Sequence, residues 1–182
     1  MILADEKLTL IPAGLELAEE TLDYFTRNQE FLRPFDPIND DRFYTLAGQR
    51  EMLAGQMEQT ERRAGWFFYI RPVADPGRIV GRVALNNVVW GAFYSCFLGY
   101  KLDGDWINRG YMTRAVTLAV EWAFSELGLH RVEGNVMPRN RRSLRVLEKC
   151  GFQMEGVSPK YLKINGVWED HIRMVKRNLA LE

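Results

Sequence analysis

This chain of 182 residues has few cysteines, no excess of charge of either sign and no long apolar run. Its two cysteines, Cys96 and Cys150, lack CxxC spacing and a cluster of histidine partners, which argues against a disulfide framework or a metal site. Lysine plus arginine and aspartate plus glutamate number 24 each, so no overall field attracts nucleic acid or an anionic membrane. Any electrostatic recognition must therefore be local.

No apolar run reaches the length of a membrane span, and the first residues, MILADEKLTL, carry acids where a signal peptide carries positive charge. We therefore expect a cytoplasmic protein with no metal, no direct nucleic-acid partner and no membrane partner. The content of hydrophobic (47%) and charged (26%) residues is ordinary for a globular protein. With 182 residues and no linker or repeat, one domain over residues 1–182 is the natural expectation.

The order of hydrophobic patterns predicts a fold that mixes helices and strands. Strands are expected near residues 8–14, 66–73, 78–89, 97–102, 130–137, 160–164 and 167–175. Helices are expected near residues 15–32, 42–63, 111–128 and 140–150, with an irregular loop at 33–40. Two hairpins are signalled by Asp-Pro-Gly at 75–77 and Asn-Gly at 165–166. Antiparallel strands followed by strand-helix-strand-helix predict a single α/β (α+β) domain with a mostly antiparallel sheet.

The chain is organised around residues 97–128, where a strand passes through a short loop into a helix. Gly110 permits the sharp bend, and the first backbone N–H groups of a helix have no partner within it. Such an end, with the positive pole of the helix dipole, suits a pyrophosphate. An ordinary strand-turn-helix is the alternative, since Walker and dinucleotide motifs are absent.

The loop resembles the coenzyme A loop of the GCN5-related N-acetyltransferases, which reads Gln or Arg, two residues, Gly, one residue, then Gly or Ala. Gly110 is kept, whereas Ile107 and Met112 depart from the first and last positions. The run from Asn86 to His171 resembles the branch that acetylates ribosomal-protein alanine. The segments that carry this resemblance are NNVVWGAFYSCFLGY, HRVEGNVMPRNRRS, CGFQMEG and YLKINGVWEDH.

The resemblance implies helices on both faces of the sheet, splayed central strands, and acetyl-CoA or coenzyme A as cofactor. It implies binding through the backbone of Tyr100 and Leu102, the helix-start residues, and the side chains of Asn140 and Ser143. The helix-start residues are Asn108, Arg109, Gly110, Tyr111, Met112 and Thr113.

Three residues are candidates for the chemistry of acetyl transfer to an amine. Glu133 and Asn135 share one face of a strand, where Glu133 could act as general base and Asn135 could hold a bridging water. A solvated strand face is the alternative. With Asn140 as N-cap, Ser143 is the third helical residue, close to the positive helix end, where its hydroxyl can orient or relay a proton to the leaving sulfur. Many members of the superfamily use a tyrosine one turn further, where this chain has Leu147.

The acceptor side is expected to include Phe35, Asn87, Asp170 and His171. The alternatives are that the aromatic residues near Phe35 cap the core and that His171 is structural. A basic helix could meet the cofactor phosphates or an acidic protein, or could simply face solvent. Its basic residues are Arg139, Arg141, Arg142, Arg145 and Lys149. Cys150 has no visible His or Asp partner, so we expect a buried, inert thiol.

The resemblance implies direct acetyl transfer, through a tetrahedral intermediate, to the N-terminal amine of a protein, plausibly a ribosomal one beginning with Ala or Ser. An N-terminal amine has a pKa near 8, so a weak base suffices. Acetylation of a small amine, or non-catalytic binding of coenzyme A or ribosomal components, are the alternatives. The protein is expected to be a monomer or a homodimer.

Overall fold

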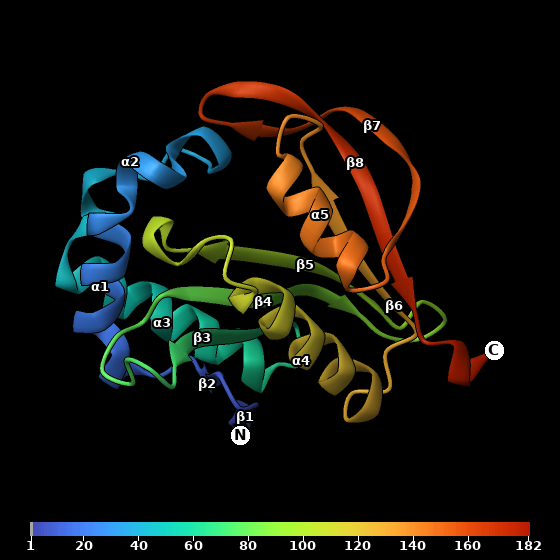
Figure 1. Ribbon diagram of the computed structural model, residues 1–182, viewed down its shortest axis with the longest axis horizontal. Helices are drawn as coiled ribbons and strands as arrows, with labels where there is room; N and C mark the ends of the chain where they lie inside the picture. The colour runs from blue at the N-terminus through green and yellow to red at the C-terminus, as the bar shows by residue number, and fades with distance from the viewer. Residues whose placement is uncertain (1) are drawn as a thin grey trace.

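A single eight-stranded sheet runs through the computed structural model, which describes residues 2–182. The strand order is β1-β2-β3-β4-β5-β6-β8-β7 (Figure 1). Every neighbouring pair is antiparallel except β5 and β6, which run parallel. The predicted mixed, mostly antiparallel sheet is therefore confirmed.

The strands are β1 (Leu3–Ala4), β2 (Leu8–Pro12), β3 (Trp66–Pro72), β4 (Gly81–Val89), β5 (Ser95–Leu102), β6 (Arg131–Val136), β7 (Gln153–Ile164) and β8 (Val167–Arg177). The α-helices are α1 (Ala18–Arg27), α2 (Gln29–Leu32), α3 (Leu46–Glu61), α4 (Tyr111–Ser125) and α5 (Arg141–Lys149). Short 3₁₀ turns are η1 (Leu15–Leu17), η2 (Arg33–Phe35), η3 (Asp41–Tyr44), η4 (Gly104–Trp106) and η5 (Leu179–Leu181).

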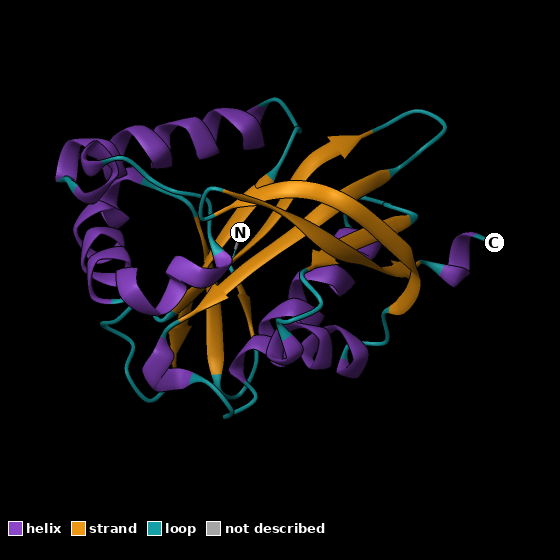
Figure 2. Cartoon of the chain, turned by 90° about the horizontal axis from the view of Figure 1, so that it is seen from above, coloured by secondary structure: helices purple, strands orange, loops and turns teal. Residues whose placement is uncertain are grey.

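Helices cover both faces of the twisted sheet, as Figure 2 shows. On one face, Ala119 and Val120 of α4 and Leu147 of α5 belong to the larger buried cluster of apolar side chains. On the other face, Tyr24 of α1 and Leu53 of α3 belong to a second buried cluster. The sheet therefore forms the middle of three layers, and its central strands can carry residues toward either side.

Both predicted hairpins are present. The Asn-Gly turn joins β7 to β8, and Asn165 and Gly166 take φ angles of 45° and 81°, the left-handed conformation that the tightest hairpin turns require. The Asp-Pro-Gly turn joins β3 to β4 in an antiparallel pair that runs from Trp66↔Leu85 to Ile70↔Gly81. Local turn chemistry therefore fixes the strand order at both places.

The helix predicted over residues 15–32 is instead broken at Asn28. This buried side chain donates from Nδ2 to the carbonyl of Tyr24 (2.9 Å) and accepts at Oδ1 from the backbone N–H of Gly104 (3.0 Å). An asparagine that bonds the local backbone competes with continuation of the helix. The break lets α2 turn toward the end of β5.

Two strand boundaries also differ from the prediction. β1 was not expected, and β7 begins at Gln153 rather than near residue 160. The register of β7 against β8 shifts between Met154 and Gly156 and again between Ser158 and Leu162, and these bulges interrupt the alternation that signals a strand. Because of this irregular pairing, the sequence pattern did not predict the first half of β7.

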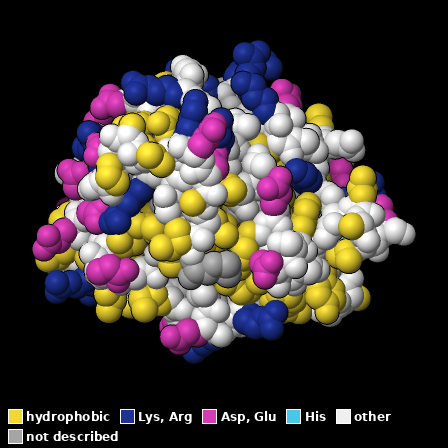
Figure 3. All heavy atoms as spheres, turned by 60° about the horizontal axis from the view of Figure 1, so that its bottom comes forward, with side chains coloured by type: hydrophobic (Ala, Val, Ile, Leu, Met, Phe, Trp, Pro, Cys, Tyr) yellow, Lys and Arg dark blue, Asp and Glu magenta, His cyan; other side chains and the backbone are white. Residues whose placement is uncertain are grey.

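Charges of both signs are interspersed on the face shown in Figure 3, in keeping with the balanced composition. Within residues 2–182, no helix combines the length and apolar character needed to cross a bilayer. The same residues contain no group of three or more His, Cys, Asp or Glu side chains arranged to hold a metal ion.

Candidate active site

The two central parallel strands separate after three residue pairs. β5 and β6 pair from Ser95↔Arg131 to Phe97↔Glu133, but β5 continues to Leu102 and β6 to Val136 without further pairing between them. Figure 1 shows the two strands diverging from that point. The edge of β5 that faces β6 is therefore open from Leu98 onward, although its other edge is paired with β4. An extended ligand with amide groups can bond to such an edge as an added strand does.

The start of α4 supplies unpaired backbone donors beside this gap. Gly110 is the N-cap residue, with a φ of 83°, and it provides no side chain to bond the first turn. The first intrahelical bond runs from the N–H of Arg114 to the carbonyl of Gly110 (3.2 Å), which leaves the N–H groups of Tyr111, Met112 and Thr113 without partners in the helix. These three donors and the helix dipole suit a phosphate group.

The start of α5 presents a hydroxyl pair on the other side of the gap. Asn140 is the N-cap, as predicted, and its Oδ1 accepts from the N–H of Ser143 (3.2 Å). Ser143 Oγ lies 2.7 Å from the hydroxyl of Tyr100 on β5, and that hydroxyl also lies 3.0 Å from the carbonyl oxygen of Ser143. Burial raises the pKa of Tyr100, so the phenol stays protonated and acts as a hydrogen-bond donor.

Leu147, at the position where the resemblance implies a tyrosine in many members of the superfamily, has no hydroxyl and is buried against β6. A Cβ atom on Gly134 would lie 2.8 Å from Leu147 Cδ1, so α5 packs closely on the strand at this point. Tyr100 brings a phenol to the serine from a different element. The sequence argument treated Tyr100 as a backbone contact only, and it therefore missed this side chain.

A cavity of about 1090 Å³ joins these features. Most of the predicted site residues line it. Those residues are Phe35, Tyr100, Leu102, Asn108, Gly110, Tyr111, Met112, Thr113, Asn135, Asn140, Ser143 and His171. The structure therefore brings together the predicted cofactor loop, the serine and part of the predicted acceptor side.

Four predicted site residues lie outside the cavity wall, and three of them are Arg109, Asp170 and Asn87. Arg109 is turned away, with its guanidinium 5.4 Å from the ring centre of Trp106. Asp170 Oδ1 accepts from the backbone N–H of Lys160 (2.9 Å), so this carboxylate organises the hairpin. Asn87 is exposed at the β4 bulge with a φ of 49°. The geometry gives these three side chains structural positions rather than contact with the cavity.

Glu133 also stands outside the wall, although Asn135 lies within it. Glu133 Oε2 pairs with Arg131 (3.1 Å), and its Oε1 accepts from Asn135 Nδ2 (3.1 Å). Asn135 Oδ1 is buried and has no hydrogen-bond partner within residues 2–182. The Glu133 carboxylate therefore holds the amide so that a free acceptor oxygen remains beside the cavity.

His171 is the one buried histidine of the described chain, and it lines the same cavity. Its Nδ1 lies 3.0 Å from the carbonyl oxygen of Glu169. A carbonyl oxygen only accepts, so Nδ1 carries the hydrogen of this bond. Because Asn135 pairs with Arg173 in register, His171 lies on the same face of the sheet as Asn135. A buried imidazole therefore lies beside Asn135 at the acceptor end of the cavity.

The predicted basic helix contributes charge along the cavity. Arg139 pairs with Glu169 (2.8 Å) and lies 5.7 Å from the ring centre of Phe35, which closes one side of the acceptor end. The other four basic residues line the cavity and have no ion pair within residues 2–182. They are Arg141, Arg142, Arg145 and Lys149. These cations can meet the phosphates of a bound ligand.

Both cysteines are free and buried. Cys150 Sγ lies 3.6 Å from Thr117 Oγ1 and 3.5 Å from the carbonyl oxygen of Thr113. Burial raises the pKa of both thiols, that of Cys96 to about 12. Neither has the electropositive surroundings of a nucleophile.

Comparison with known proteins agrees with this geometry. Residues 7–153 match the model of the Acetyltransferase (GNAT) domain. A probable N-acetyltransferase, YjcK, of Bacillus subtilis (strain 168) is 44% identical over 160 residues, which cover 88% of each chain. The [Ribosomal protein uS5]-alanine N-acetyltransferase of Escherichia coli (strain K12) is 33% identical over 150 residues, which cover 82% of this chain and 77% of that one.

Solved structures show the same arrangement. The ribosomal-protein-S5-alanine acetyltransferase from Vibrio fischeri superposes with a TM-score of 0.94 at 32% identity and covers 100% of this chain and 99% of that one. RimJ of Mycobacterium smegmatis, solved in complex with CoA-disulfide, has a TM-score of 0.89 at 26% identity and covers 96% of this chain and 83% of that one.

Proposed function

The chain belongs to the GNAT acetyltransferase family, and from this premise we propose that it transfers acetyl from acetyl-CoA to the N-terminal α-amine of a protein. The predicted family, acyltransferase activity and fold are confirmed, and the predicted cofactor is confirmed at the level of the family. The observation that carries the proposal is the open β5 edge between the free amides of α4 and the Ser143–Tyr100 pair.

The residues present fit coenzyme A along its length. The N–H groups of Tyr111, Met112 and Thr113 would bind the pyrophosphate, and the free basic residues of α5 lie along the same cavity. The open edge of β5 near Tyr100 and Leu102 would bond the amides of the pantetheine arm. Acetyl-CoA supplies the acetyl group as an activated thioester.

Ser143 is the proposed donor to the leaving sulfur. Tyr100 has a single hydrogen, which either the Ser143 carbonyl oxygen or Ser143 Oγ can accept. When Oγ accepts it, the serine hydrogen is free to point into the cavity. The serine also lies in the first turn of α5, where the helix dipole stabilises negative charge. Tyr100 is therefore a positioning residue that acts through Ser143.

His171 is the proposed acceptor of the amine proton. Its Nε2 lone pair lies on the face that carries Asn135, whose free Oδ1 can hold the same amine or a bridging water. An N-terminal amine needs only a weak base, because its pKa is about 8. Glu133 supports this pair indirectly, through its bond to Asn135.

A protein acceptor is favoured by the similarity to enzymes that modify ribosomal-protein alanine. The test is a thiol-release assay with acetyl-CoA and peptides that begin with Ala or Ser, including the N-terminal peptide of the host uS5 protein. A matched peptide with a blocked N-terminus is the control, and spermidine represents small amines. Release with free peptides alone supports the proposal, whereas turnover of spermidine but no peptide would replace it with a small-amine acetyltransferase.

A further inference from the structure

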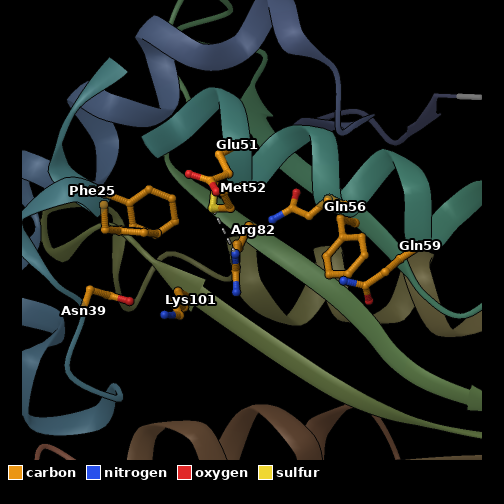
Figure 4. Close-up of a pocket in the computed structure, with 11 residues that line it drawn as sticks. Phe25, Asn39, Glu51, Met52, Gln56, Gln59, Arg82 and Lys101 are labelled. Atoms are coloured by element: carbon orange, nitrogen blue, oxygen red, sulfur yellow. Dashed lines mark hydrogen bonds between the residues drawn. The ribbon is translucent and has the colours of Figure 1, made fainter. Parts of the chain in front are cut away.

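A second cavity, of about 350 Å³, lies on the face of the sheet that α1 and α3 cover (Figure 4). Arg82 enters it from β4 and Lys101 from β5. Lys101 also lines the larger cavity, so the two spaces meet at this side chain. The α3 wall follows helical spacing through Met52, Gly55, Gln56 and Gln59.

Arg82 has no carboxylate partner within residues 2–182. Apart from the Lys101 cation, its neighbours are neutral. The guanidinium lies within hydrogen-bonding reach of the Tyr69 hydroxyl, Nη1 lies 4.0 Å from Met52 Sδ, and the guanidinium carbon lies 5.8 Å from the ring centre of Phe25. A partly buried guanidinium is normally paired, because its planar fork binds carboxylates with two parallel hydrogen bonds. The cavity therefore presents a cation whose best partner is missing from the protein itself.

The other charges at the cavity are already matched. Lys101 pairs with Asp36, and Glu51 at the rim pairs with Arg42 at 2.9 Å between two largely exposed side chains. One positive charge therefore remains, on Arg82. The pKa of Lys101 is lowered, first by desolvation and next by the nearby Arg82 cation, a repulsion that an anion between them would relieve.

Gly55 leaves room for a ligand. A Cβ atom at this position would meet no atom within 4 Å, although the residue lines the cavity in the interior of α3. Glycine in a helix interior lowers stability relative to alanine. Because Gly55 has no side chain, the wall of α3 leaves this part of the cavity open.

We propose that this cavity binds a carboxylate, which the Arg82 guanidinium holds with the Lys101 ammonium beside it. The carboxylate belongs to an Asp or Glu side chain close to the N-terminus of the acceptor peptide. The choice of source rests on the proposed function, because the amine end of the peptide would occupy the larger cavity on the other side of Lys101. Phe25 and Met52 would contact the aliphatic part of the acidic side chain.

The test measures kcat/KM for peptides that share one N-terminus and carry Glu or Gln at each of positions two to five. A charge-assisted bond to arginine predicts that Glu is preferred at one position by about 10-fold or more. The substitution Arg82→Gln should remove the preference, and Gly55→Met, which fills the cavity and leaves every charge in place, should do the same. Arg50→Gln, on the exposed side of α3, is the matched control and should keep it.

A second arm uses free succinate and the melting temperature, and it requires no acceptor. Loss of the Glu preference in both cavity variants supports a carboxylate from the acceptor. No Glu preference, with succinate stabilising the wild type but not Arg82→Gln, supports a separate small carboxylate. Absence of both effects overturns the proposal. If the peptides are acetylated without a preference for Glu, the carboxylate site is refuted but the proposed acetyltransferase function is not. Failure of the carboxylate proposal is therefore distinguishable from failure of the proposed function.

Discussion

Replacing Tyr100 with phenylalanine removes one hydroxyl and leaves the buried ring in place. The lost oxygen lies 2.7 Å from Ser143 Oγ and 3.0 Å from the Ser143 carbonyl oxygen. A neutral hydrogen bond contributes about 0.5–1.5 kcal/mol, so we expect Tyr100→Phe to lower the free energy of unfolding by about 1 kcal/mol. The same loss at the transition state corresponds to a decrease in kcat of about 5-fold.

Steady-state kinetics with a saturating peptide should show this decrease with little change in the KM for acetyl-CoA, since the open backbone edge of β5 is untouched. Ser143→Ala should lower kcat further, and it should slow turnover more than it weakens cofactor binding. In the double variant the two effects should not add, because Tyr100 acts through the serine.

Additive effects of the two substitutions would refute the reasoning, since they would show that the phenol and the serine act independently. A change confined to cofactor affinity in either variant would refute the assignment of Ser143 as donor to the leaving sulfur.

Four further predictions concern the helix starts and the thiols. Gly110→Ala places a side chain at a φ of 83°, a left-handed conformation that costs about 1–2 kcal/mol. Calorimetry should therefore show several-fold weaker binding of acetyl-CoA. Unchanged affinity would show that this loop does not bind the cofactor. Asn140→Ala removes the cap of α5 and should lower the melting temperature by about 2–4 °C in a thermal scan, and no change would show that the cap is dispensable. Cys96 and Cys150 should react with a thiol reagent at pH 8 only after unfolding, and fast reaction of the native protein would contradict their burial. Burial raises the pKa of Cys96 to about 12 from an ordinary value of 9.0, so the thiol ionises more readily in the unfolded chain than in the folded protein. Its contribution to the free energy of unfolding should be complete below pH 9 and should decline as the pH rises toward 12. Denaturant titrations over this pH range measure the decline.

Features set by nearby residues could be predicted from the sequence. Gly110 marked the bend before α4, Asn140 marked the cap of α5, and Asn165-Gly166 marked a hairpin, because each depends on backbone conformation within a few residues. The position of Ser143 then followed by counting from its cap. The resemblance to the family added the splayed strands, which no hydrophobic pattern encodes.

Features that join distant segments could not be predicted in this way. Tyr100 alternates with Leu98 and Leu102 and so reads as a core residue, and its bond to Ser143 spans 43 positions. The unpaired Arg82 emerges only when α3 and β4 pack together. Glu133 is a different case, because Arg131 stands two residues away on the same strand face. This spacing is compatible with the ion pair, but the sequence analysis did not predict it.

The brief parallel pairing of β5 and β6 has a consequence for solvent access to the backbone. Three residue pairs join the half of the sheet that holds β1 to β5 to the half that holds β6 to β8. Amide hydrogens at this seam are shielded, whereas those of Leu98–Leu102 that face the gap have no strand opposite them. Deuterium uptake in the ligand-free protein should therefore rise abruptly just past Phe97, and that step would mark, residue by residue, where the sheet comes apart.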